Sequence, residues 1–316
     1  MLRFLLRRLF SLLVVLLGVS LVIFVLMDII PGDPVAIRMG QRADPELREI
    51  IRRELNLDKP LLVRYGIFLG KLARGDLGRS YDKNLPVTEV LWDKFLNTLY
   101  LTLAAMLIAV GVGMALGVVA SLKPNSPLDL GLMVLAVIGL SVPVFWLGMM
   151  LQLIFSGKLP ISGMGEFGRP WWENLDHLVL PAVTLATVPM AVIARITRSS
   201  MLEVWQEEFV RTAVAKGLPP VRIVLRHVLR NALIPIVTVI GNNFALLLTG
   251  AVLTETVFSW PGVGSAMVQA IERRDIPLVI GGVMMLSATF VVVNFLVDLL
   301  YALIDPRVRV SEEGVG

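Results

Sequence analysis

The chain contains no cysteine among its 316 residues and only two histidines. Without cysteine it can form no disulfide, no thiolate metal site, no iron–sulfur cluster and no cysteine nucleophile. The two histidines, His177 and His227, are isolated, and no His-Glu-x-x-His pattern occurs. A membrane-embedded enzyme therefore has little material for a catalytic site, and a proton relay built from several acidic or histidine side chains is not indicated.

Charge is also scarce, because only 17% of the residues are charged and 56% are apolar. A soluble protein usually carries about 25% charged residues. The deficit gathers into six uncharged runs, and a helix needs about 20 apolar residues to cross a bilayer. The runs are Leu9–Met27, Phe95–Leu122, Leu130–Gly157, His177–Ala194, Asn231–Thr254 and Ile276–Val297.

These runs predict an all-α, polytopic membrane protein with six transmembrane helices and a small outer cap. The expected organisation is a first transmembrane helix at 1–28, an extracytoplasmic cap segment at 29–94, a five-helix transmembrane core at 95–305 that includes a cytoplasmic loop at 195–231, and a cytoplasmic tail at 306–316. Met1–Met27 resembles a signal peptide, but its apolar run is long and no small-x-small cleavage site follows. We expect an uncleaved first span.

Basic residues set the expected orientation, since short cytoplasmic segments carry an excess of lysine and arginine. With the amino terminus inside, the cytoplasmic segments hold thirteen basic residues, whereas the two short outer loops hold four. The long outer segment is too long to follow the rule. We expect a multi-pass protein of the inner (cytoplasmic) membrane, with both termini in the cytoplasm.

The outer segment 29–94 shows two amphipathic stretches. Asp44-Pro45 suits a helix start, and a helical pattern follows it. The second stretch is Leu61–Leu72, which ends before Arg74-Gly75-Asp76. The segment is expected either to be a solvated cap packed on the membrane helices or to dock or gate at the outer mouth.

Small residues recur every four positions in the second run, at Ala105, Ala109, Gly113, Gly117 and Ser121. On a helix they share one face, and helices in lipid associate by close packing over such faces. The spacing predicts a helix-packing ridge, which is either static or part of a sliding gate.

Polar residues inside spans are costly and often functional. The fifth and sixth runs contain Asn242, Asn243, Thr249, Asn294 and Asp298, which we interpret as candidates for a translocation path. Asp298 alternatively pairs with a basic group near the inner interface.

Prolines and glycines are expected to break the fourth run, at Pro181 and Pro189, and the outer end of the fifth. Thr254–Gly264 reads as a short outer hairpin or re-entrant segment. Trp260 within it suits the headgroup region.

The cytoplasmic loop 195–231 is basic and amphipathic on both sides of a break. Met201–Lys216 has a helical pattern, and Gly217-Leu218-Pro219-Pro220 can close one helix and start another. Beyond it, Val221, Val224, Leu225 and Val228 are expected to share one face. The pattern alone fits either a surface helix held against anionic lipid or a rigid projection that transmits force from a soluble partner.

Arg211–Gly217, followed by Arg230-Asn231-Ala232-Leu233-Ile234-Pro235, resembles the cytoplasmic "EAA" loop of binding-protein-dependent ABC importer permeases. The closer resemblance is to the B-type subunit of the dipeptide/oligopeptide/nickel branch. Arg211 and Thr212 stand where the general pattern has Glu and Ala, while Ala213 and Gly217 match. Further matching stretches are Ile30–Pro34, Leu57–Pro60, Gly75–Gly78, Arg195–Val204, Thr254–Gly264 and Asp305–Arg307.

The resemblance implies a second homologous permease forming a heterodimer, two ATPase subunits and an extracytoplasmic solute-binding protein. It also implies a coupling loop for the ATPases at Arg211, Thr212, Ala213, Lys216, Gly217 and Leu218. The chain has no G-x-x-x-x-G-K-[ST] phosphate loop. ATP hydrolysis, with ATP and Mg, is therefore expected on the partner ATPases. The chain itself is expected to be non-catalytic, with no cofactor or metal of its own and no nucleic-acid partner.

The resemblance implies a peptide substrate, and nickel or glutathione importers of the same family are alternatives. A secondary transporter would need no ATPase, but it would show intramembrane ionisable groups and inverted repeats. A third alternative is a purely structural scaffold, but the polar residues of the fifth and sixth runs argue against it.

Overall fold

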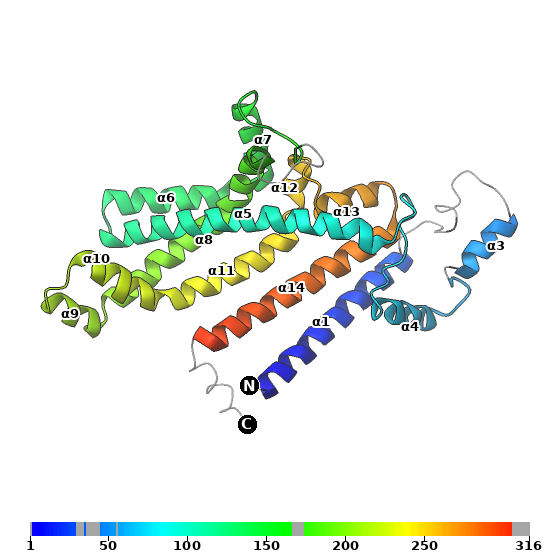
Figure 1. Cartoon of the computed structure of the whole chain (residues 1–316), viewed down its shortest axis with the longest axis horizontal. Coiled ribbons are helices and arrows are strands. Elements are labelled where there is room, and N and C mark those ends of the chain that lie inside the picture. Colours follow the sequence, from blue (N-terminus) through cyan, green and yellow to red (C-terminus); the bar gives the residue numbers. More distant parts are fainter. Residues whose placement is uncertain (1, 30–34, 36–44, 55, 166–173, 305–316) are drawn as a thin grey trace. The chain divides into compact units, whose positions relative to one another are not determined.

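A computed structural model describes the chain except for residues 1, 30–34, 36–44, 55, 166–173 and 305–316 (Figure 1). Within this part of the chain the regular structure is helical, with one isolated bridge between Arg79 and Pro86. The helices are α1 (Leu2–Ile29), α3 (Pro45–Glu54), α4 (Leu61–Leu72), α5 (Val87–Leu122), α6 (Pro127–Ser141), α7 (Val144–Phe155), α8 (Leu175–Trp205), α9 (Glu208–Ala215), α10 (Pro220–Arg222), the π-helical segment η2 (Ile223–Leu229), α11 (Arg230–Gly250), α12 (Val252–Val257), α13 (Val263–Glu272) and α14 (Ile276–Ile304).

Every apolar run of the sequence falls on helices. Four described helices are long and apolar enough to cross a membrane: α5, α8, the continuous stretch Pro220–Gly250, and α14 over Ile276–Val297. The α6–α7 pair counts as a fifth if it is one span, and α1 contains the shorter apolar stretch Phe10–Leu26. The prediction of an all-α membrane protein is confirmed.

The chain divides into two compact units. One contains Asn97–Pro261 with Thr289–Gly316, and the other contains Leu2–Leu96 with Gly262–Ala288.

In the first unit α8 is the central helix, which packs against α6, α7, α11 and α12. Its most apolar window is 61% buried, against 22% for Pro220–Gly250. The expected break in this run was wrong, because α8 is continuous through Pro181 and Pro189, both of which are buried. Proline is tolerated in a membrane helix when neighbouring helices support the local backbone, and α8 is surrounded by them.

The third apolar run is not one straight helix, since α6 and α7 meet at an angle of 102°. Val142 and Pro143 lie between them in extended conformations, with ψ of 125° and 130°. A residue that precedes proline is sterically driven away from the helical region. The uncharged run predicted the membrane segment, but the Val142-Pro143 step bends it.

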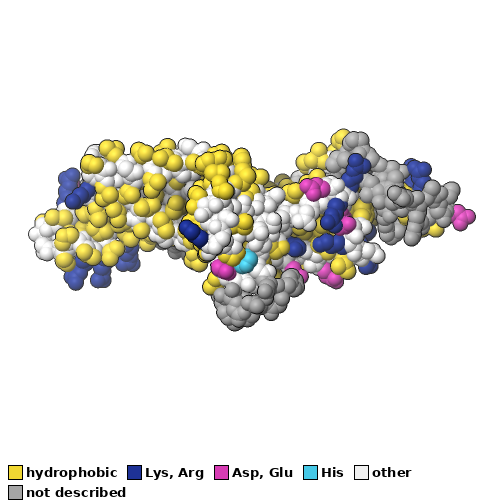
Figure 2. Space-filling model, turned by 90° about the horizontal axis from the view of Figure 1, so that it is seen from above, with side chains coloured by type: hydrophobic (Ala, Val, Ile, Leu, Met, Phe, Trp, Pro, Cys, Tyr) yellow, Lys and Arg dark blue, Asp and Glu magenta, His cyan; other side chains and the backbone are white. Residues whose placement is uncertain are grey.

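The face of the first unit over α6 is apolar (Figure 2). Its exposed side chains include Leu128, Leu130, Val134, Leu135, Val137 and Ile138. Basic side chains gather at the end of this unit where α9 and α10 lie. This distribution fits a helix that faces lipid and a basic end outside it.

In the second unit the predicted Leu61–Leu72 helix is present as α4, and it packs on α1. Tyr65 stacks near Phe68 and Phe24, with ring centroids 6.4 Å and 5.4 Å away, and its hydroxyl shares a 2.9 Å hydrogen bond with Ser20. α3 begins at Pro45 as expected, while Asp44 lies outside the described residues. This part of the segment that was expected to form a cap is therefore attached to α1.

Asp275 organises the rest of the second unit. Its buried carboxylate accepts hydrogen bonds from the Ser80 hydroxyl and from the backbone N–H of Tyr81 at 3.0 Å. Nearby, Arg273 pairs with Asp82 at 2.5 Å on a more exposed surface. These contacts fix the segment before α5 to the start of α14.

Candidate functional site

The loop with the strongest sequence signal forms a compact projection, here called the knob, made of α9, α10 and η2. α8 ends at Trp205, and α9 begins two residues later at Glu208, so the expected single helix over Met201–Lys216 was wrong. Gln206 caps α8, and Glu207 is extended, with ψ of 144°. The short break lets α9 leave the axis of α8.

Gly217 ends α9 in a left-handed conformation, with φ of +70°. The Gly217 N–H donates to Val214 O at 2.9 Å, and the Leu218 N–H donates to Ala213 O at 3.4 Å. These two bonds form the Schellman pattern, in which a left-handed residue satisfies the last carbonyls of a helix. Pro219 and Pro220 then start the next helix, as the sequence predicted.

A buried apolar cluster holds the knob against α8 and the start of α11. Met201 of α8 is fully buried, and it is joined by residues of α9, η2 and α11. The other members are Val210, Ala213, Ile223, Val224, Val228, Ala232 and Ile236. The knob is therefore packed as a continuation of the helical bundle and is not a loose loop.

η2 changes which side chains face this cluster. An α-helical pattern would place Val221, Val224, Leu225 and Val228 together, but Val221 and Leu225 are 69% and 57% exposed. A π-helix closes i→i+5 hydrogen bonds and has more residues per turn. The register therefore shifts, and Ile223 joins Val224 and Val228 in the core.

The six predicted coupling residues divide between the two sides of the knob. Arg211, Thr212, Lys216 and Gly217 are exposed, Leu218 is half-buried and Ala213 is buried. Apolar side chains are exposed beside them, at Phe209, Val214, Val221 and Leu225. The outer surface of the knob is thus basic and apolar at once, which suits a protein partner better than a purely solvated surface does.

The five residues of the small-residue ridge are all buried, and α5 lies against α8 along them. A Cβ placed on Gly113 would lie 2.6 Å from Met190 O, and one on Gly117 would lie 2.5 Å from Ala194 O. At the end of α5 nearest the knob, the Ser121 hydroxyl donates to Val118 O at 2.7 Å and lies 3.5 Å from the Met201 sulfur. The backbones can approach this closely only because the ridge lacks side-chain bulk.

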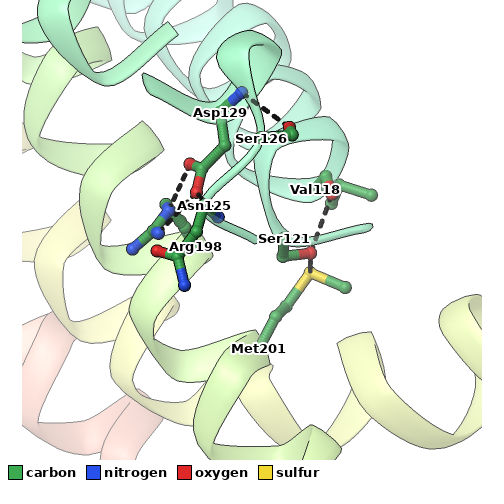
Figure 3. Close-up of polar contacts among 7 residues, drawn as sticks. All are labelled: Val118, Ser121, Asn125, Ser126, Asp129, Arg198 and Met201. Carbon is green, nitrogen blue, oxygen red and sulfur yellow. Dashed lines mark hydrogen bonds and ion pairs between the residues drawn. The ribbon is translucent and has the colours of Figure 1, made fainter. Parts of the chain in front are cut away.

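A polar cluster that the sequence reasoning missed lies beside Ser121 and Met201 (Figure 3). Asp129 is 1% exposed, and Arg198 of α8 binds it with Nε donating to Oδ1 at 2.5 Å and Nη2 donating to Oδ2 at 2.6 Å. The N–H of Asn125 also donates to Oδ2 at 2.8 Å, and the Asp129 N–H donates to the Ser126 hydroxyl at 3.2 Å. Ser126-Pro127 is a local helix-start signal, but no local signal could have identified Arg198 as the partner of Asp129.

The candidate path residues lie on α11 and α14. Asn242 is exposed and Asn243 is half-buried, with the Asn243 amide donating to Val239 O at 2.8 Å. Thr249 donates to Leu246 O at 3.0 Å, and Asn294 donates to Phe290 O at 2.8 Å. The side chain of Asp298 lies outside the described residues.

The two helices that carry these path residues touch closely in the first unit. A Cβ on Gly241 would lie 2.6 Å from the γ-carbons of Val297. The hydrogen bonds of Asn243, Thr249 and Asn294 stay within their own helices. The structure therefore brings α11 and the end of α14 together without a polar cross-link among these residues.

Trp260, which was expected to suit the headgroup region, is buried within the protein. It is 1% exposed, its ring stacks on Tyr100 with centroids 6.5 Å apart, and its indole N–H donates to Asn97 O at 3.0 Å. Glu255 is also fully buried and accepts a 2.6 Å bond from the Thr98 hydroxyl. The sequence of Thr254–Gly264 showed an aromatic residue near the end of an apolar run, but not that residues of α5 would cover it.

A helical membrane bundle that ends in a rigid projection is the architecture of a membrane subunit through which a partner can act. Nothing in the described residues suggests a metal centre, because they contain no group of three His, Asp or Glu side chains placed to hold an ion. The class defined by the fold is a helical membrane protein with a packed projection at one end of its bundle.

Comparison with known proteins identifies the particular family. Residues 109–310 match the family described as "binding-protein-dependent transport system inner membrane component", and residues 1–102 match its N-terminal membrane component. The chain belongs to this family of ABC importer permeases, which confirms the resemblance seen in its motifs. It is accordingly an inner-membrane, non-catalytic subunit.

Characterised relatives align over nearly the full length. The chain is 45% identical to the di/tripeptide transport system permease protein DppB of Pseudomonas aeruginosa and 42% identical to the dipeptide transport system permease protein DppB of Escherichia coli, with 98% of this chain and 99% of each relative covered. It is also 42% identical to the glutathione transport system permease protein GsiC of Pectobacterium atrosepticum, with the same coverage.

Solved structures show the same fold at low identity. The chain matches the methionine ABC transporter MetNI in an inward-facing conformation with a TM-score of 0.54 and 18% identity, covering 69% of this chain and 97% of that one. An amino acid ABC transporter matches with a TM-score of 0.53 and 16% identity, covering 68% and 94%. These likenesses support the type I ABC importer fold.

Proposed function

We propose that this permease forms half of the translocation path of an ATP-driven importer of short peptides. Its relatives named for di- and tripeptide transport match over the whole chain, which supports this substrate class. The relative named for glutathione transport keeps that tripeptide as the alternative. The proposal includes a second, homologous permease as the other half, a solute-binding protein that delivers the peptide from outside, and both termini in the cytoplasm.

The path in this proposal runs along α11 and α14. Asn242, Asn243, Thr249, Asn294 and Asp298 are its proposed polar positions. Asn242 is exposed on a helix whose apolar window is only 22% buried, so α11 offers a surface for a partner permease and a solute between them. An exposed amide in lipid is unfavourable, whereas one that faces an aqueous path is not.

Energy enters through the knob in this proposal, since the chain has no phosphate loop. The observation that carries it is the buried cluster around Met201, Val210 and Val228, which joins the knob to α8 and α11. A rigid connection of this kind passes a displacement of the knob to the membrane helices. One of the two partner ATPases, which bind ATP and Mg, would dock on the exposed side of this knob at Arg211, Thr212 and Lys216, and the other would dock on the second permease.

The experiment replaces Gly217 with valine in the complete complex of both permeases, the ATPases and the binding protein. A β-branched residue is strained at φ of +70°, although no atom lies within 4 Å of the added Cβ. The left-handed conformation costs an L-residue about 1–2 kcal/mol. Local rearrangement of the turn should lower peptide uptake per ATP hydrolysed about tenfold, while membrane assembly and ATP hydrolysis persist.

Gly157 provides the matched control, because it has φ of +78° and likewise nothing within 4 Å of its Cβ. Gly157→Val imposes the same backbone strain after α7, away from the knob, and should leave uptake per ATP unchanged. Normal uptake by Gly217→Val would contradict the coupling role. Uptake that is driven by an ion gradient without the ATPases would instead indicate a secondary transporter.

A further inference from the structure

The Asp129–Arg198 pair has no part in the loop motif, yet it lies where three cytoplasmic helix ends meet. Asp129 is the third residue of α6, just after the turn that follows α5. Arg198 is on the part of α8 that leads to the knob, and Met201, one turn further, contacts Ser121 at the end of α5 (Figure 3). The pair therefore connects the α5–α6 hairpin to the helix that carries the knob.

The contacts between Asp129 and Arg198 hold both side chains in one geometry. A carboxylate that is 1% exposed takes both donors of one guanidinium, and a backbone N–H from Asn125 binds the same group. Bidentate Arg–carboxylate pairs fix direction as well as distance. Asn125 itself is left-handed, with φ of 60°, so the turn between α5 and α6 is shaped to bring its N–H to Asp129.

The pair also stands at one end of a continuous contact. α6 and α8 pack along each other, and a Cβ on Gly139 would lie 3.3 Å from the Thr187 side chain and 3.9 Å from Ala191. Dispersion contacts of this kind are individually weak and have no hydrogen-bond geometry to maintain. A bidentate ion pair at the cytoplasmic end does have such a geometry, because any shift of about 1 Å breaks its hydrogen bonds.

We infer that Asp129 and Arg198 are positioning residues for energy coupling: they clamp the α5–α6 hairpin to α8, so that displacement of the knob moves these helices as one body. This inference rests on the proposed function of the knob. A buried pair of this kind often adds little to stability compared with apolar side chains of the same size. The proposed role of the clamp is therefore to determine which helices move together, not to raise the stability of the fold.

The test uses the double variant Asp129→Asn/Arg198→Gln in the complete transport complex. Asparagine keeps the size of Asp129, glutamine keeps part of the Arg198 stem and a polar end, and both charges are removed, so no single charge is left buried. Assembly and ATP hydrolysis should stay close to those of the unaltered complex, while peptide uptake per ATP should fall about fivefold or more. Arg198→Lys, which keeps the charge and loses the fork, should recover part of the uptake.

Arg195→Gln is the matched control, since Arg195 is exposed on the same helix one turn earlier. It should transport like the unaltered complex. If the double variant keeps normal uptake per ATP, or loses assembly and ATP hydrolysis in proportion to uptake, the clamp is overturned. Failure of the unaltered complex to import peptide with ATP would instead reject the proposed function, so the two failures are distinguishable.

A second measurement uses the absence of native cysteine. Asp129→Cys/Arg198→Cys should show low uptake per ATP, and bridging the two thiols with short bis-maleimides of graded length should restore it. Modification with a monofunctional maleimide is the control and should restore nothing. Bridged complexes that stay uncoupled at every linker length would overturn the clamp.

Discussion

The close approach of α5 and α8 makes a sharp prediction about Gly117. A Cβ at this position would lie 2.5 Å from both Ala194 O and the Thr197 Cβ, whereas ordinary van der Waals contact begins at 3.4 Å. Gly117→Ala therefore forces the two backbones apart locally by roughly 0.9 Å, and overpacking of this kind costs about 1–3 kcal/mol. Alanine gains up to about 1 kcal/mol over glycine in a helix, which offsets only part of the cost.

Gly111 is on the same helix and has no atom within 4 Å of its added Cβ. Gly111→Ala should thus be neutral or slightly stabilising, opposite in sign to Gly117→Ala. A difference of about 2 kcal/mol corresponds to roughly 4–8 °C between the melting temperatures of the two variants. The assay is thermal unfolding of the purified permease in one detergent. Equal melting temperatures, or a more stable Gly117→Ala, would refute the tight α5–α8 contact.

Two further predictions concern buried polar contacts. Asp275→Asn keeps one carbonyl acceptor but loses the charge that holds Ser80, so it should destabilise the permease by about 2 kcal/mol. Asp82→Asn, which removes one charge of the exposed Arg273 pair, should cost less than about 1 kcal/mol. Equal melting temperatures for the two variants would contradict the organising role of Asp275. Trp260→Phe should keep the aromatic contact and lose the indole hydrogen bond to Asn97 O, so the free energy of unfolding should fall by about 1 kcal/mol. A fall in the free energy of unfolding as large as that of Trp260→Ala would contradict this, because it would show that the ring packing depends on the hydrogen bond.

The sequence predicted those features that depend on local spacing. The apolar runs located the membrane helices, and the amphipathic pattern of Leu61–Leu72 matches α4 residue for residue. The four-residue spacing from Ala105 to Ser121 placed small residues on one face because a helix fixes which residues share a face. Gly217 was located as the end of a helix, since glycine followed by two prolines is a strong local signal.

Features that depend on partners could not be read in this way. Propensity places a break at Pro181 and Pro189, but α8 stays continuous because other helices surround it. The register of Val221 and Leu225 changed because η2 is π-helical, and nothing in its composition marks that geometry. Arg198 looked like a topology signal, and only the fold reveals that its partner, 69 residues earlier in the chain, is Asp129.

The burial of α8 has a consequence for how this permease responds to its bilayer. With 61% of its apolar window covered by protein, α8 exchanges protein contacts for other protein contacts when it moves. Helices that border lipid, such as α6, must deform or displace acyl chains, and the cost of doing so varies with membrane thickness. The movement of the helix that leads to the knob should therefore depend less on membrane thickness than that of α6 does.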